Sequence, residues 1–126
     1  MDLTIQTLKK GDSVFTLALN GEINSQTHQL LEDELKKLIN DQTKAVFLDM
    51  SRISYISSIG VKTVLSAKKV LKEKNANFAM VNLQPGVKKV FDVLKLLPIF
   101  EIFDEMPEAD KYIDQIIKEE MNKQAA

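Results

Sequence analysis

The sequence contains no cysteine and only one histidine, His28. The absence of cysteine excludes disulfides, thiolate metal sites and cysteine nucleophiles. A single histidine on a predicted helix, with no supporting acid or base, indicates a surface role rather than a catalytic one. Glycine is scarce as well, and Gly21, Gly60 and Gly86 form no phosphate-cradling loop of known spacing, so we expect no nucleotide cofactor.

Long apolar runs are also missing. No stretch approaches the roughly 18 apolar residues of a membrane span, and the N-terminus has neither the basic region nor the apolar run of a signal peptide. The sequence therefore predicts no membrane span. The lack of cysteine is compatible with a reducing compartment, and we expect the protein to be cytoplasmic.

Charge is nearly balanced, with a net charge of -1, but it is unevenly distributed. Residues 1–100 hold 14 Lys and Arg against 10 Asp and Glu, whereas residues 101–126 hold 3 against 8. A nucleic-acid-binding protein would carry a basic stripe without an acidic cover, so we expect no direct nucleic-acid partner. The pattern predicts a mildly basic body beside an acidic C-terminal helix at about residues 107–122.

The 126 residues suffice for one domain with a real core, so we expect a single domain over residues 1–126. Hydrophobic periodicity predicts strands at 3–9, 13–20, 45–49, 77–82 and 100–103. It predicts helices from an N-cap at Asn24 or Ser25 to about 39, at 58–74, from Pro85 to a stop before Pro98, and at 107–122. The order β-β-α-β-α-β-α-β-α implies an α/β fold with a mixed β-sheet of about five strands and four packed helices.

Several local expectations follow from the same patterns. Residues 21–25 are expected to break the second strand, and residues 50–56 to form a polar loop in which Asp49 accepts hydrogen bonds. Leu30 and Met121 are expected to face inward on the first and last helices, together with Leu31, Leu35, Leu38, Ile39, Tyr112, Ile113, Ile116 and Ile117. The last five residues are expected to fray.

The most informative segment runs from Leu48 to Val61. Its pattern predicts the end of a buried strand, a polar loop, and a serine pair, Ser57 and Ser58, at the first turn of a helix. A hydroxyl there faces unpaired N–H groups and the positive end of the helix, which suits a phosphate. No base or acid for nucleophilic chemistry lies nearby in the sequence, so we expect a serine that is modified. The simpler alternative is that Ser57 or Ser58 is only an N-cap, worth about 1 kcal/mol to the helix.

Three segments of the chain resemble the STAS domain family, which includes the anti-anti-sigma factors (anti-sigma factor antagonists). Residues 49–60, DMSRISYISSIG, resemble the family's phosphorylation-site segment, and residues 21–27, GEINSQT, resemble its Gly-Glu-hydrophobic-Asp segment. Residues 82–104, NLQPGVKKVFDVLKLLPIFEIFD, resemble its later helix and closing strand. The resemblance covers about residues 3–110, with the three segments in the expected order and spacing.

The resemblance implies a single STAS-like domain that acts as a partner switch and is not an enzyme. In that family the serine matching Ser58 is phosphorylated by a cognate anti-sigma factor, a serine kinase of the kinase-like ATPase type, and a phosphatase is a further expected partner. The unphosphorylated form binds the kinase and so displaces a sigma factor, whereas the phosphorylated form does not bind. The resemblance implies no catalytic, cofactor-binding or metal-binding residues, and a partner-binding face made of Asn24, Ser57, Ser58, Ile59, Gly60 and Lys62. Gly60 is expected to allow the partner's close approach.

Four of these positions depart from the family's usual pattern. Ser57 and Asn24 stand where an Asp is common, Ile59 stands where a small residue is usual, and Lys62 stands where Gly is common. These substitutions make the predicted site less acidic than the usual one, and Lys62 would place a cation near a phosphate on Ser58.

Two other functions remain open at this point. The chain could be a STAS subunit of a constitutive complex, lipid-transport or stressosome-like, in which Ser58 is a helix cap and nothing more. A small hydrolase that uses Ser58 is disfavoured, because no histidine is placed in the sequence to activate the hydroxyl.

Overall fold

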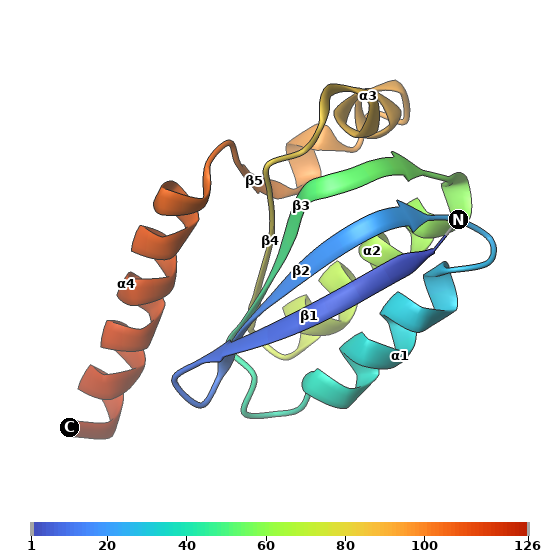
Figure 1. Cartoon of the computed structure of the whole chain (residues 1–126). Coiled ribbons are helices and arrows are strands. Elements are labelled where there is room, and N and C mark those ends of the chain that lie inside the picture. Colours follow the sequence, from blue (N-terminus) through green and yellow to red (C-terminus); the bar gives the residue numbers. More distant parts are fainter. Residues whose placement is uncertain (1, 126) are drawn as a thin grey trace.

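The computed structural model describes residues 2–125, with side chains up to Lys123, as a five-stranded sheet and four α-helices (Figure 1). The strand order is β1-β2-β3-β4-β5; β1 runs antiparallel to β2, and all other neighbours are parallel. The predicted α/β class, the mixed sheet and the element order are confirmed; a short 3-10 helix, η1, was not predicted. The elements are β1 (Leu3–Lys10), β2 (Val14–Ile23), α1 (His28–Leu38), β3 (Ala45–Ile56), α2 (Ser58–Glu73), β4 (Asn77–Val81), α3 (Pro85–Val93), η1 (Leu97–Ile99), β5 (Glu101–Phe103) and α4 (Met106–Ala125).

Helices cover both faces of the sheet, and the alternation along β3 shows how. Val46 and Leu48 point into the main core, which they share with apolar residues of α1, α2 and α3. Ala45 and Phe47 point to the opposite face and pack in a second cluster with Ala109 and other residues of α4. Figure 1 shows α4 on the side of the sheet away from α1 and α2. A strand covered on both faces is nearly all apolar, which explains the sequence of residues 45–48.

The strands β2 and β3 are longer than the sequence predicts. Gly21 does not break β2, which continues to Ile23, and β3 continues through the expected polar loop to Ile56. The register between them shifts at two points, between Ala18 and Asn20 and between Gly21 and Glu22. At each shift β3 carries one more residue than β2, as in a β-bulge. Bulges disrupt the strict alternation of polar and apolar residues, so the extended strand resembles a loop in sequence.

The first helix begins later than predicted. Thr27 occupies the N-cap position of α1, and Asn24 and Ser25 lie in the turn that precedes it. Leu31 and Leu35 are buried as expected. The inward prediction for Leu30 is wrong, because its side chain is 50% exposed.

The third and fourth helices also differ from the prediction. Helix α3 ends at Val93 rather than near Pro98, and the chain turns at Lys95 with φ 59. Helix α4 extends to Ala125, although we expected fraying over residues 122–126; Ala126 lies outside the described residues. The inward prediction for Met121 is wrong, because its side chain is 64% exposed. Ile113 and Ile116 are buried, and Tyr112 and Ile117 pack against their cluster.

Candidate functional site

The serine pair lies where the predicted phosphorylation segment meets α2. Ile56 ends β3, Ser57 follows as the N-cap, and Ser58 is the first residue of α2. The Ser57 N–H donates to the carbonyl oxygen of Ile23 over 2.9 Å, which ties the start of the helix to the end of β2. Ser57 Oγ accepts a hydrogen bond from the Gly60 N–H at 3.3 Å. Ser57 is therefore the cap, and the alternative that Ser58 is the helix cap is wrong.

Ser58 is exposed and takes no part in the capping hydrogen bond. His28, the only histidine, is near this end of α2, but its Nδ1 atom lies 3.5 Å from the hydroxyl oxygen of Thr63. Thr63 Oγ1 in turn donates to the carbonyl oxygen of Ile59. Within the described residues, His28 forms no hydrogen bond with Ser58.

Gly60 is buried beneath the serine pair rather than open to a partner. A Cβ atom at this position would lie 2.8 Å from the carbonyl oxygen of Ile23 and 2.8 Å from a side-chain carbon of Ile56. The glycine therefore lets the first turn of α2 approach the ends of β2 and β3. We expected Gly60 to let a partner approach closely. This is wrong, because Gly60 is buried and the space where a side chain would extend is occupied by Ile23 and Ile56.

Asn24 lies at the same edge of the sheet as Ser57. The parallel register pairs Ile23 with Ile56, so the residues that follow these two strands are neighbours. The side-chain oxygen of Asn24 accepts hydrogen bonds from the backbone N–H of Gln26 at 2.9 Å and of Thr27 at 3.1 Å. Asn24 thus shapes the turn into α1, as Asx residues commonly do, while remaining partly exposed.

The remaining two predicted residues differ in exposure. Ile59 is half-buried, and Lys62 is exposed one helical turn after Ser58. The first turn of α2 contains no acidic residue. The structure therefore brings Asn24, Ser57, Ser58, Ile59 and Lys62 to one end of the molecule, with Gly60 beneath them.

Tyr55, the penultimate residue of β3, also lies near this end of the sheet but was not predicted as a site residue. Its side chain is 50% exposed, and it lies in the half of β3 where Ser51, Arg52 and Ser54 are exposed as well. The available signal was an aromatic residue within the polar stretch 51–58.

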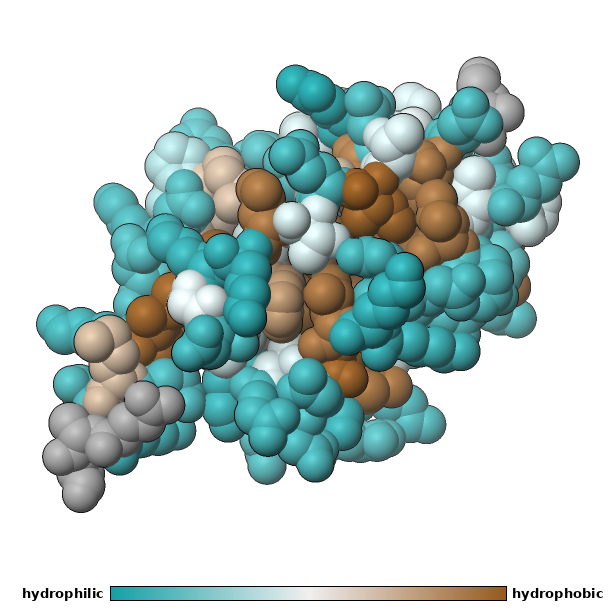
Figure 2. Space-filling model, turned by 60° about the horizontal axis from the view of Figure 1, so that its bottom comes forward, coloured by the Kyte–Doolittle hydropathy of each residue, from teal (hydrophilic) through white to brown (hydrophobic). Residues whose placement is uncertain are grey.

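Elsewhere, Figure 2 shows hydrophilic side chains over most of the face in view, with apolar side chains in separate patches.

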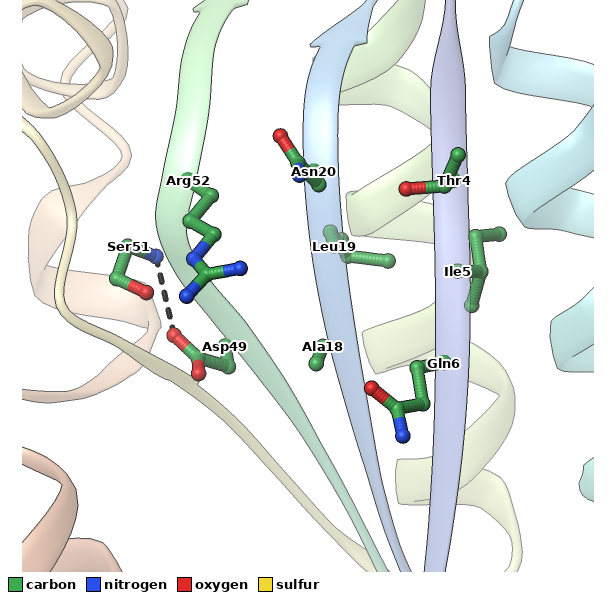
Figure 3. Close-up of a pocket in the computed structure, with 9 residues that line it drawn as sticks. All are labelled: Thr4, Ile5, Gln6, Ala18, Leu19, Asn20, Asp49, Ser51 and Arg52. Atoms are coloured by element: carbon green, nitrogen blue, oxygen red, sulfur yellow. Dashed lines mark hydrogen bonds between the residues drawn. The ribbon is translucent and has the colours of Figure 1, made fainter.

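A hollow of about 360 Å³ lies on the part of the sheet that α4 leaves uncovered. Figure 3 shows Gln6, Asn20 and Arg52 projecting from three adjacent strands at this place. Asp49 borders the hollow, and its Oδ1 accepts the Ser51 N–H at 3.0 Å. Asp49 thus accepts a hydrogen bond as predicted, but within β3 rather than in a loop. This polar hollow is separate from the serine pair.

Residues 2–125 lack two features that would point to other functions. No group of three or more His, Cys, Asp or Glu side chains in this range is placed to hold a metal ion. No helix in the same range is long and apolar enough to cross a bilayer.

The chain is similar in sequence and in fold to known proteins. The family model described as "STAS domain" matches residues 6–109. A candidate anti-sigma factor antagonist of Bordetella bronchiseptica, BtrV, is 33% identical over 96 residues, which are 76% of this chain and 83% of that protein.

Two solved structures are similar in fold. An anti-sigma factor antagonist from Mycobacterium paratuberculosis has a TM-score of 0.77 at 20% identity, covering 89% of this chain and 94% of that one. The anti-sigma factor antagonist SpoIIAA, in its unphosphorylated form, has a TM-score of 0.75 at 20% identity, covering 88% and 97%. SpoIIAA of Bacillus has also been solved in a phosphorylated form.

Proposed function

Because the chain belongs to the STAS domain family, we propose that it is an anti-sigma factor antagonist controlled by phosphorylation of Ser58. The unphosphorylated protein binds an anti-sigma factor and so releases a sigma factor. The phosphorylated protein does not bind. As a STAS domain the chain is a binding module and not an enzyme.

The observation that carries the proposal is the position of Ser58. Ser57 already caps α2, so the hydroxyl of Ser58 is exposed and has no role in starting the helix. An exposed serine at the edge of the sheet that does not cap the helix is accessible to a kinase. This observation also counts against a constitutive assembly in which Ser58 serves only as a cap.

A phosphate on Ser58 is expected to change binding without unfolding the domain. It adds roughly -1.5 to -2 charges and three acceptor oxygens. At the first turn of α2 this charge lies near the positive end of the helix, where it is tolerated. Inside a docking surface it adds bulk and a desolvation cost, and a loss of about 2.7 kcal/mol lowers affinity roughly a hundredfold.

The proposal names the partners by their chemistry. We propose that the anti-sigma factor is also the serine kinase, of the kinase-like ATPase type, and that a phosphatase restores the binding form. The kinase transfers a phosphoryl group from ATP: a bond forms between Ser58 Oγ and phosphorus, the bond to ADP breaks, and the hydroxyl proton leaves. Since sigma factors act on RNA polymerase, the proposal places the protein in the cytoplasm.

Intact-mass spectrometry of protein from its native cell, before and after phosphatase treatment, tests whether the modification exists. Peptide mapping across residues 54–62 distinguishes Ser58 from Ser57. We expect one phosphate, on Ser58. Its absence under every growth condition would favour the constitutive-assembly alternative.

Two substitutions test the switch itself once the anti-sigma factor is purified. Ser58→Ala is expected to bind like the unphosphorylated protein, and Ser58→Asp to bind more weakly because it adds a negative charge. Equal affinities of the two variants would contradict the switch.

A further inference from the structure

We propose that Lys62 is the contact that phosphorylation switches. Its ammonium group binds a carboxylate of the partner while Ser58 is unmodified, and it binds the phosphate once Ser58 is modified. This inference rests on the proposed function, since it requires a phosphate on Ser58 and a partner at this surface. It goes further by naming the residue whose charge partner changes and the acidic chemistry of the partner's face.

The geometry of α2 places the two side chains together. Ser58 and Lys62 are four residues apart, so they are neighbours on the helix surface, separated by about 6 Å along its axis. Both are exposed, so neither has to leave a packed position to meet the other. An anion four residues N-terminal to a lysine is the more favourable of the two orders.

Lys62, like most lysines of the chain, has no ion-pair partner within the described residues. Five other lysines form ion pairs, among them Lys74, which lies 2.9 Å from Asp41. The first turn of α2 offers it no acidic residue. An exposed, unpaired cation beside a proposed docking surface is available to a carboxylate of the partner.

Two titratable groups on the neighbouring elements have contacts of their own. Glu22 of β2 accepts a hydrogen bond from the side-chain amide of Asn24 at 3.3 Å. His28 of α1 contacts Thr63 at 3.5 Å. Along α2, the lysine nearest in sequence to a phosphate on Ser58 is Lys62, and the next is Lys68.

In the proposed exchange, the phosphate weakens partner binding in two ways. It removes the cation that the partner uses, and it presents a negative charge to the acidic group that the cation had bound. Both effects weaken binding, so the full effect of phosphorylation requires Lys62.

The intramolecular half of the proposal is tested without any partner. The protein is produced with phosphoserine encoded at position 58, and the second pKa of the phosphate is measured by ³¹P NMR titration. We expect Lys62→Met to raise this pKa by about 0.3, the size of an exposed ion pair four residues apart on a helix. Lys62→Arg should restore the original value. Lys69→Met is the matched control, since this exposed lysine lies about 16 Å from Ser58 along the axis of α2. Equal pKa values for Lys62→Met and Lys69→Met would overturn the proposal.

The intermolecular half is tested with the purified anti-sigma factor. Its dissociation constant is measured for the phosphorylated and unphosphorylated forms of the original protein and of Lys62→Met. We expect Lys62→Met to weaken binding of the unphosphorylated form and to reduce the fold-change caused by phosphorylation. An unchanged fold-change would overturn the role of Lys62 while leaving the proposed function in place. If phosphorylation altered binding in neither protein, the proposed function itself would fall, although the ³¹P result could still stand.

Discussion

Ser57 and Ser58 have identical side chains, but only Ser57 Oγ accepts a hydrogen bond from the helix backbone, at 3.3 Å from Gly60 N. We predict that Ser57→Ala lowers the free energy of unfolding by about 1 kcal/mol, because an amide of the first turn loses its acceptor. Ser58→Ala should change it by less than about 0.5 kcal/mol. Urea denaturation of both variants measures the difference. Equal losses would argue against Ser57 as the cap.

Gly60 and Gly86 both lie in the first turns of helices, but their surroundings differ. We predict that Gly60→Ala destabilises the protein by about 1–3 kcal/mol, because the added methyl group would lie 2.8 Å from Ile23 and Ile56. Gly86→Ala, with no atom within 4 Å of the new methyl group, should be neutral or stabilising by up to about 1 kcal/mol. Thermal or urea unfolding provides the measurement, and a stable Gly60→Ala variant would show that α2 can move away from the strands.

At the scale of elements, the sequence predicts the number, type and order of the strands and main helices but not the length of β2 and β3. The strand at 45–48 is recognisable because burial on both faces makes it almost wholly apolar. Beyond Asp49 the polar residues obscure the buried Met50, Ile53 and Ile56, since two register shifts remove the simple alternation. A bulge is set by pairing with a neighbouring strand, which a single sequence does not display.

Helix α4 illustrates a similar limit. Its apolar spacing suggests that Met121 continues the buried stripe of Ile113, but the stripe extends past the cluster it packs against. We predict that Ile113→Ala lowers the free energy of unfolding by about 2–5 kcal/mol, because it leaves a cavity against the sheet. Met121→Ala, the control, should change it by less than about 0.5 kcal/mol. Chemical denaturation separates the two; a large loss for Met121→Ala would mean that α4 packs more extensively.

The end of α2 is joined to the loop after α1 by an exposed ion pair. The hydrogen bond and charge of Lys74 lower the pKa of Asp41 below its ordinary value of 3.8. A carboxylate whose pKa is depressed in the folded state stabilises that state above pH 3.8, and this contribution is lost as the pH falls through the lower, folded-state pKa.

We predict that Lys74→Ala raises the pKa of Asp41 toward 3.8, because it removes both the hydrogen bond and the nearby positive charge. NMR titration of the Asp41 carboxyl group measures the change, with Lys72→Ala as the control on the same helix. An unchanged pKa in Lys74→Ala would mean that the ion pair does not form in solution.

At the scale of the whole molecule, the position of the candidate site could be predicted more fully than its internal roles. The resemblance to the STAS family placed Asn24 and the serine pair on one face, and the parallel pairing of β2 and β3 brings them to the same edge of the sheet. Which of Ser57 and Ser58 caps α2 depends on the residue at which the helix begins. The sequence pattern does not locate the start of a helix to within one residue. The burial of Gly60 depends on how closely α2 approaches two strands, which is a matter of packing across the sheet.

The most direct test of the account is the dissociation constant of the purified anti-sigma factor for homogeneous unphosphorylated and Ser58-phosphorylated protein, measured by isothermal titration calorimetry. Circular dichroism of both forms confirms beforehand that the domain stays folded. We expect the unphosphorylated form to bind and the phosphorylated form to bind with an affinity lower by roughly a hundredfold or more. Equal dissociation constants would contradict the proposal that Ser58 controls partner binding.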